Sequence, residues 1–319
     1  MRVRQRERAR QVSPLQGSRT FAGSDGVAEL PPTRSPFRAA LVALRPRQWL
    51  KNLLLFAGII FAAELGDGGR WLEAVAAFLA YCAASSAAYL VNDVRDVEVD
   101  GLHPVKRKRP IASGELRPRT ALVLAGVLAV LAVAVVTTLG LPSLLALLGF
   151  VGLQAAYTLR LKHVVLVDVL TIAALFVVRA AAGAIAVDVR ISPWLLVCTG
   201  LLALFLALGK RRAELELVGA NRAPGRPVLE GYSLGLVDRL LAGVAVVTIV
   251  VYTLYTVTAR DSSALLLTVP FVIFGLGRYL SLLRRRDMGE EPENVLLGDI
   301  PILLTVAIWA VACAVILAW

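Results

Sequence analysis

The sequence predicts an all-α integral membrane protein built from nine transmembrane helices. Of its 319 residues, 58% are hydrophobic, and the mean hydropathy is +0.72, as is typical of membrane proteins. Nine apolar runs approach the ~20 residues that span hydrocarbon: 48–65, 71–91, 121–140, 142–159, 164–187, 193–209, 238–257, 264–280 and 300–319. Leu, Ala and Val fill these runs without the apolar–polar alternation of a membrane barrel, so we expect helices.

The charges between the apolar runs set the expected orientation. Four connections are rich in Lys and Arg: 92–120, 160–163, 210–237 and 281–299. Three others carry one arginine each: 66–70, 188–192 and 258–263. The positive-inside rule places the rich connections and the N-terminus in the cytoplasm and the C-terminus outside the cell membrane. The net charge is +11, and its positive residues are distributed as membrane orientation requires, concentrated in the cytoplasmic connections. We therefore expect no nucleic-acid partner.

Residues 1–36 differ in composition from the predicted membrane domain, 37–319. The segment begins with arginines at every second position: Arg2, Arg4, Arg6, Arg8 and Arg10. Ser, Gly, Pro and Thr follow with little apolar content. We therefore expect a disordered basic arm that rests on anionic lipid and has no catalytic part.

The segment 92–100 carries the clearest chemical signal. Three carboxylates and an asparagine fall on one face of the expected helix: Asn92, Asp93, Asp96 and Asp100. Arg95 and Glu98 point away from that face. Grouped carboxylates suit Mg²⁺, which takes one or two of them and completes its shell with water and substrate phosphate. We predict that Asp93, Asp96 and Asp100 are metal ligands and that Asp93 and Asp96 are catalytic.

A basic block follows the acidic segment directly. Lys106, Arg107, Lys108 and Arg109 offer positive charge and forked donors to phosphate oxygens. Metal and cations side by side at a membrane surface indicate a diphosphate site, with Lys106, Arg107 and Arg109 binding substrate beside Asn92. The alternative is a solvated loop whose charges only hold the membrane orientation.

Lys51 and Asn52 lie inside the first apolar run, near its cytoplasmic rim. Two interpretations are open. The lysine either snorkels to lipid headgroups, or both side chains point inward and bind a substrate phosphate.

Polar residues also mark the fourth and fifth runs. Tyr157 and Lys162 end the fourth, and Asp168 begins the fifth. Arg179 follows Asp168 on the same helical face, ~16 Å deeper. Because a mid-membrane arginine is costly unless paired or hydrated, we expect this face to line a wet cavity open to the cytoplasm. We predict a catalytic role for Asp168 and substrate binding for the other three; for Arg179 a structural ion pair is the alternative.

Lys210 and Arg211 follow the sixth run as the chain leaves the bilayer, where they can bind a lipid phosphate. The alternative is that they serve only as an orientation signal. The polar loop that follows, 210–237, is long for a connector and contains Tyr232. We expect this loop to cap the site.

The motif Asn92-Asp93-x-x-Asp96-x-x-x-Asp100 in an all-helical chain resembles the UbiA-type superfamily of intramembrane prenyltransferases, over nearly all of residues 40–319. More narrowly, Arg-Pro-Arg-Gln-Trp-Leu-Lys-Asn at 45–52 and His-Pro-x-Lys-Arg-x-Arg-Pro-Ile-Ala at 103–112 resemble the phosphoribosyl-transferring branch. The Gly-Lys-Arg-x-Ala-Glu-Leu and Glu-Pro-Glu segments at 209–215 and 291–293 agree with that branch.

The resemblance implies a Mg²⁺-dependent transfer of 5-phosphoribosyl from phosphoribosyl diphosphate (PRPP) to polyprenyl (decaprenyl) monophosphate, for synthesis of cell-wall arabinan precursors. Typical members of the superfamily carry a second aspartate-rich motif near 154–172, where this chain has Asp168 alone. Prenyl transfer to an aromatic acceptor and a non-enzymatic lipid-phosphate carrier are the alternatives. A homo-oligomer is compatible with the sequence.

Overall fold

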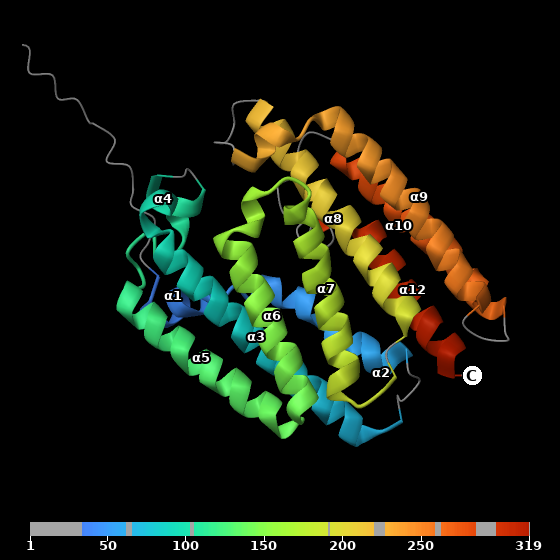
Figure 1. The fold of residues 1–319 in the computed structure, drawn as a ribbon, viewed down its shortest axis with the longest axis horizontal. Helices are drawn as coiled ribbons and strands as arrows, with labels where there is room; N and C mark the ends of the chain where they lie inside the picture. Colours follow the sequence, from blue (N-terminus) through green and yellow to red (C-terminus); the bar gives the residue numbers. More distant parts are fainter. Residues whose placement is uncertain are drawn as a thin grey trace, which may run out of the picture. The chain divides into compact units, whose positions relative to one another are not determined.

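The computed structural model describes residues 34–61, 66–102, 105–190, 192–219, 227–258, 263–284 and 298–318. Every regular element within these ranges is a helix, so the predicted all-α class is confirmed (Figure 1). The predicted basic arm, 1–36, lies outside them except for its last three residues.

Seven of the described helical segments are long and apolar enough to cross a membrane. Six are continuous helices: α3 (Gly68–Arg95), α5 (Pro118–Thr138), α6 (Leu141–Leu159), α7 (Val167–Ala186), α8 (Pro193–Gly219) and α9 (Leu234–Thr258). The seventh joins the 3₁₀ helix η5 (Ser263–Thr268) to α10 (Val269–Leu283). The last apolar run forms α12 (Ile300–Ala318).

Short elements complete the described chain. Three of them precede the first long helix, α3: α1 (Pro36–Ala43), η1 (Pro46–Phe56) and α2 (Ala57–Phe61). The others lie in the connections: α4 (Val97–Leu102), η2 (Lys106–Lys108), η3 (Leu161–His163) and η4 (Pro227–Gly231).

Two predicted boundaries were wrong. The run 48–65 is not one α-helix, because residues 46–56 adopt the tighter 3₁₀ form before α2 begins. The loop expected from residue 210 begins later, since α8 continues to Gly219. Its last turns are held by ion pairs: Arg212 lies 2.9 Å from Glu216 on the same helix and 2.7 Å from Asp238 on α9.

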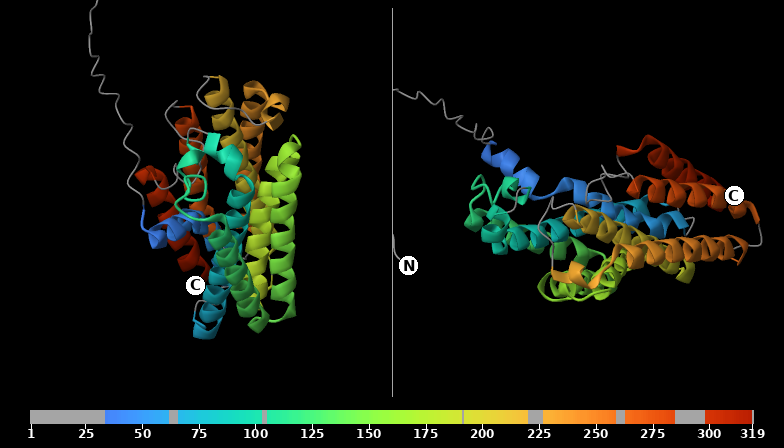
Figure 2. Two further views of the ribbon diagram at one scale, coloured as in Figure 1. Left: turned by 90° about the vertical axis from the view of Figure 1, so that its left-hand side faces the viewer. Right: turned by 90° about the horizontal axis from the view of Figure 1, so that it is seen from above.

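Helix α7 lies between two groups of helices (Figure 2). On one side it packs on α6, with α3 and α5 beyond, around buried residues that include Tyr81 and Phe150. On the other side it packs on α8, with α9, α10 and α12 beyond, around residues that include Phe205 and Tyr279. The segment η1–α2 crosses both α3 and α7.

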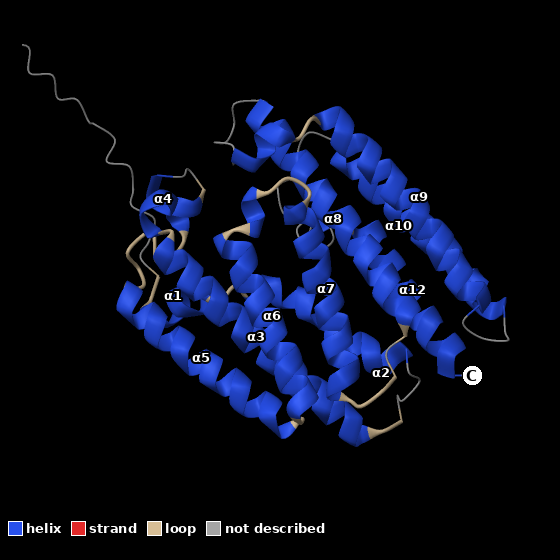
Figure 3. Ribbon diagram, in the orientation of Figure 1, coloured by secondary structure: helices blue, strands red, loops and turns tan. Residues whose placement is uncertain are grey.

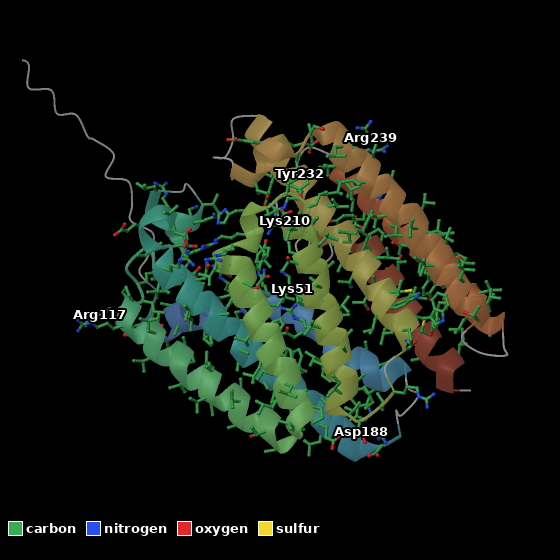
Figure 4. The ribbon with its side chains drawn as sticks, viewed as in Figure 1. Lys51, Arg117, Asp188, Lys210, Tyr232 and Arg239 are labelled. Atoms are coloured by element: carbon green, nitrogen blue, oxygen red, sulfur yellow. The ribbon has the colours of Figure 1, made fainter. Side chains whose placement is uncertain are left out.

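The described parts of three basic connections lie at one end of the helices (Figure 3). This basic end is defined here by residues 96–102, 105–117, 160–166 and 227–233. Figure 4 shows Tyr232 and Arg239 at this end and Asp188 at the opposite one. Polar side chains from segments far apart in the sequence therefore lie at the same end of the helices.

Small residues allow η1 and α2 to approach α7 at backbone contact. A Cβ atom at Gly183 would lie 2.6 Å from Leu55 Cα and still closer to the Leu55 carbonyl oxygen. A Cβ atom at Gly58 would lie 2.6 Å from the Ala184 nitrogen. Small residues are how membrane helices achieve such contacts. This contact fixes the position of η1 against α7.

We expect Gly183→Ala to lower stability by about 1–3 kcal/mol, because the added methyl group has no space and must push η1 away. Thermal unfolding of the purified protein in detergent measures the effect. Gly149→Ala is the matched control, since a Cβ atom there meets nothing within 4 Å; alanine in that open helical position should be neutral or stabilising by up to about 1 kcal/mol. Equal midpoints for the two variants would contradict the expected role of Gly183.

Candidate active site

The acidic segment is divided by a break in the helix. Helix α3 ends at Arg95, Asp96 caps it, and α4 starts at Val97. Asp93 and Asp100 are each only 3% exposed. Asp96 is half-buried and accepts a hydrogen bond from the Asn92 amide at 3.1 Å. Asp96 therefore differs from Asp93 and Asp100 in its burial and in its hydrogen-bond partner.

Two arginines hold the buried carboxylates. Arg109 Nη1 lies 3.2 Å from Asp93 Oδ1 and 2.5 Å from Asp100 Oδ2, so one guanidinium joins both residues. Arg45 Nη2 lies 2.6 and 2.8 Å from the two oxygens of Asp93. We call Arg45, Asp93, Asp100 and Arg109 the open cluster, because both arginine side chains are about a quarter exposed.

The open cluster includes a residue that the sequence analysis missed. Arg45 begins the motif at 45–52 that carries the resemblance, but only Lys51 and Asn52 of that motif were predicted to bind substrate. Its backbone is left-handed, with φ 55°, as the chain turns from α1 into η1. A buried bridge holds this turn: Trp49 Nε1 donates to Ser86 Oγ at 3.0 Å, and that hydroxyl donates to the Leu44 carbonyl at 2.8 Å. The turn thus aims Arg45 at the end of α3.

The open cluster fits a divalent cation shared with a substrate phosphate. Within the described residues, no three acidic, histidine or cysteine side chains lie close enough to form a cage of protein ligands alone. Asp93 and Asp100 nevertheless share one cationic group, the Arg109 guanidinium. Mg²⁺ commonly uses one or two carboxylates together with phosphate and water. The pair Asp93–Asp100 therefore fits that ion, whereas Asp96 points to Asn92.

The rest of the basic block directly precedes Arg109 in the chain. Lys106, which is half-buried, and the exposed Arg107 and Lys108 form η2, and Arg109 caps it. His103 and Pro104 of the same motif, like the Glu-Pro-Glu segment at 291–293, lie outside the described residues.

A second group, the sealed cluster, forms between α7, α8 and η4. Asp168 is fully buried and accepts a 2.6 Å hydrogen bond from the Tyr232 hydroxyl. Arg211 Nε lies 2.9 Å from the other Asp168 oxygen, close enough for an ion pair although not aligned as a hydrogen bond. Arg211 also pairs with Glu214. One arginine thus joins two carboxylates here too, but it is only 1% exposed.

Tyr232 fastens the sealed cluster to the start of α7. Its hydroxyl accepts a 2.8 Å hydrogen bond from the Leu166 nitrogen, at a residue held in a positive-φ conformation. Burial and the hydrogen bond to Asp168 raise the pKa of Tyr232, so its hydroxyl stays protonated and donates at neutral pH. We had assigned no site role to Tyr232 or Glu214. The sequence did contain an indication for Glu214: it lies three residues after Arg211 on a helix, the spacing at which two side chains can form an ion pair.

Arg179 does not share a partner with Asp168. It is 4% exposed, and its Nε donates to Asn52 Oδ1 at 2.8 Å. Nη1 donates to the Leu175 carbonyl at 3.0 Å, and the guanidinium stacks on the ring of Phe150, 4.5 Å from its centroid. Among the described carboxylates none pairs with it, so the alternative of a structural ion pair finds no support there. Its partners join α7 to η1.

Four further predicted binding residues belong to neither cluster. They are half-buried and come from four elements: Lys51 on η1, Tyr157 on α6, Lys162 on η3 and Lys210 on α8. Figure 4 shows Lys210 toward the basic end and Lys51 deeper along the helices. The basic end therefore combines carboxylates with cations at several depths.

Comparison with known proteins shows which family and which relatives this chain is similar to. Residues 53–298 match the UbiA prenyltransferase family. A Mycolicibacterium smegmatis protein named decaprenyl-phosphate phosphoribosyltransferase is 34% identical over 284 residues, which cover 84% of this chain and 89% of that protein. The protein of the same name from Mycobacterium tuberculosis is 33% identical over 297 residues, which cover 90% of this chain and 96% of that protein.

A solved structure shows the same fold. The UbiA homologue from Archaeoglobus fulgidus bound to DMAPP and Mg²⁺ matches with a TM-score of 0.68 at 20% identity, covering 88% of this chain and 99% of that one. The family match and the apolar helices together make this a multi-pass membrane protein. The family match over residues 53–298 and the relatives that are more than 30% identical over most of the chain lead to one conclusion: the chain belongs to the UbiA prenyltransferase family.

Proposed function

We propose that this chain transfers 5-phosphoribosyl from PRPP to polyprenyl (decaprenyl) monophosphate and releases diphosphate, in a step that serves cell-wall arabinan precursors. The observation that carries the proposal is the open cluster, which sets paired carboxylates and two arginines at the end of membrane helices. The two relatives named decaprenyl-phosphate phosphoribosyltransferase support the choice of substrates.

The open cluster would hold the donor. Asp93 and Asp100, with Asp96 as a further ligand, would bind Mg²⁺, which when bound neutralises charge on the leaving diphosphate. The donor phosphates then engage the cations around them: Arg45, Lys106, Arg107 and Arg109. Positive charge placed where the leaving oxygens become more anionic lowers the barrier as the ribose C1 becomes oxocarbenium-like.

The acceptor is a monophosphate, which is already anionic at neutral pH and needs no strong base. Three half-buried lysines and Tyr157, together with the buried Asn52 and Arg179, would orient it while its tail lies between helices; the lysines are Lys51, Lys162 and Lys210. Attack from the face opposite the diphosphate inverts the anomeric centre. The sealed cluster, with Asp168 and Arg211, positions the start of α7 and the end of α8 beside this path.

We further propose that all nine apolar segments cross the plasma membrane, with η1–α2 as the first and α12 as the last. The basic end then faces the cytoplasm, the N-terminus lies inside and the C-terminus outside. Residues 1–36 act as a basic arm on anionic lipid, separate from the membrane domain at 37–319.

Asp93→Asn should reduce transfer by about 100-fold or more, because it removes a carboxylate from the donor site. The assay is Mg²⁺-dependent conversion of labelled PRPP and polyprenyl phosphate into a product that extracts into organic solvent. Glu98→Gln is the matched control, since Glu98 is exposed on the same segment. Full activity of folded Asp93→Asn, or full activity in excess chelator, would show that the open cluster does not bind a metal needed for the reaction.

Donor choice distinguishes the proposal from prenyl transfer to an aromatic acceptor, which the structural likeness to a DMAPP-bound homologue makes the second candidate. We expect PRPP to bind with Mg²⁺, and geranylgeranyl diphosphate to bind much more weakly and to displace labelled PRPP poorly, because the chain has Asp168 alone where the superfamily carries a second aspartate-rich motif. Direct binding of both labelled compounds measures this. Mg²⁺-dependent binding of the prenyl diphosphate with none of PRPP would favour the second candidate.

The proposed orientation predicts opposite labelling of the two ends. In a variant without Cys82, Cys198 and Cys313, a cysteine replacing Arg190, which is exposed near Asp188, should react with an impermeant thiol reagent added to intact cells. A cysteine replacing Arg239 should react only in inverted membrane vesicles. The reverse pattern would show that the basic end faces outward.

A further inference from the structure

The carboxylates of the open cluster already have cationic partners within the chain. Asp93 is bound by both Arg45 and Arg109, and Asp100 by Arg109. Two carboxylates and two guanidiniums sum to no net charge. A divalent cation that arrived alone would therefore be repelled by two arginines held against its ligands.

The open and sealed clusters differ in how firmly their arginines are held. Arg211 is 1% exposed and is joined to Asp168 and Glu214 within packed helices. Arg109 is 28% exposed and lies after the three-residue η2 helix, and Arg45 is 25% exposed at the turn between α1 and η1. Neither arginine lies within a helix interior, so both can reorient without disrupting a helix; Arg45 would give up its stacking on the Tyr89 ring, 4.8 Å from its centroid.

We propose that Arg45 and Arg109 are exchangeable counter-ions: they hold Asp93 and Asp100 until metal and donor arrive, then turn to the donor diphosphate as the metal takes the carboxylates. The forked guanidinium suits either partner, since it binds carboxylate and phosphate oxygens in the same bidentate way. Metal and diphosphate consequently bind cooperatively, each strengthening the other to the same extent. The nature of the diphosphate rests on the proposed function; the exchange itself does not.

Metal binding without any phosphate compound tests the exchange. Mn²⁺, whose free form gives an electron paramagnetic resonance signal, is titrated into the purified full-length chain. Wild type should bind weakly, and Arg109→Gln should bind about tenfold more tightly or better, because it frees the carboxylates. Arg45→Gln should change in the same direction. Arg117→Gln is the control: it removes an equal charge from an exposed side chain at the outer edge of the bundle, and it should match wild type (Figure 4).

Donor binding provides the second measurement. With Mg²⁺ present, Arg109→Gln should bind PRPP about tenfold more weakly than wild type. Opposite changes in metal and donor affinity are the signature of the exchange, because a residue that only supports the fold would weaken both. Arg109→Lys, which keeps the charge but loses the fork, should fall between wild type and Arg109→Gln in both titrations.

Two outcomes would overturn the exchange. One is unchanged or weaker Mn²⁺ binding in folded Arg109→Gln and Arg45→Gln; the other is wild-type Mn²⁺ binding as tight as theirs. If Arg109→Gln fails to fold, Arg45→Gln and Arg109→Lys carry the same comparison. If wild type with Mg²⁺ does not bind PRPP, the proposed function fails. Inorganic diphosphate then replaces PRPP in the second measurement, and the exchange is still tested.

Discussion

The contact of η1 with α7 is the constraint on which the rest of the arrangement depends. Gly183 lets η1 meet α7, Gly58 does the same for the adjoining α2, and this close approach lets Asn52 reach Arg179. A buried arginine among membrane helices needs hydrogen-bond partners, because hydrocarbon supplies none. Asn52 and the Leu175 carbonyl supply them, and the Phe150 ring adds a cation–π contact. The same placement of η1 sets Arg45, just before its first residue, against Asp93 at the end of α3.

The open and sealed clusters contain the same chemical unit, an arginine paired with two carboxylates, in two different surroundings. In the sealed cluster the unit is fully buried, and the Tyr232 hydroxyl adds a link to the backbone at Leu166. Breaking such a buried set would leave charges without partners, so it behaves as a fixed joint between α7, α8 and η4. In the open cluster the arginines reach the surface, and water lowers the cost of separating the charges. Exposure, rather than residue type, distinguishes the sealed cluster from the open cluster, which is the proposed binding site.

The sequence was informative where local pattern decides structure. Apolar runs predicted the helical class and most helix positions, and the spacing of 92–100 identified Asp93 and Asp100, which the structure brings to one arginine. Pattern could not reveal the 3₁₀ form of η1, which depends on packing against α7, or the break at Asp96. Nor could it identify partners far apart in the chain. Arg45 meets Asp93 across 48 positions, and Tyr232 meets Asp168 across 64. Periodicity gives the face of a helix, but tertiary contact selects the partner.

The hydrogen bond from Arg179 to Asn52 spans 127 positions of the chain, and this separation has a consequence for biosynthesis. During translation η1 emerges well before α7, so its polar side chain and its close-packing surface have no counterpart when they reach the translocon. Asn52 can meet Cys82 once α3 has been inserted, but its contact with Arg179 forms only after α7 has followed, so the final seating of η1 depends on α7. The earliest apolar segment to be made is thus among the later ones to be seated. Its short, tightly wound form suits delayed docking against helices already in place.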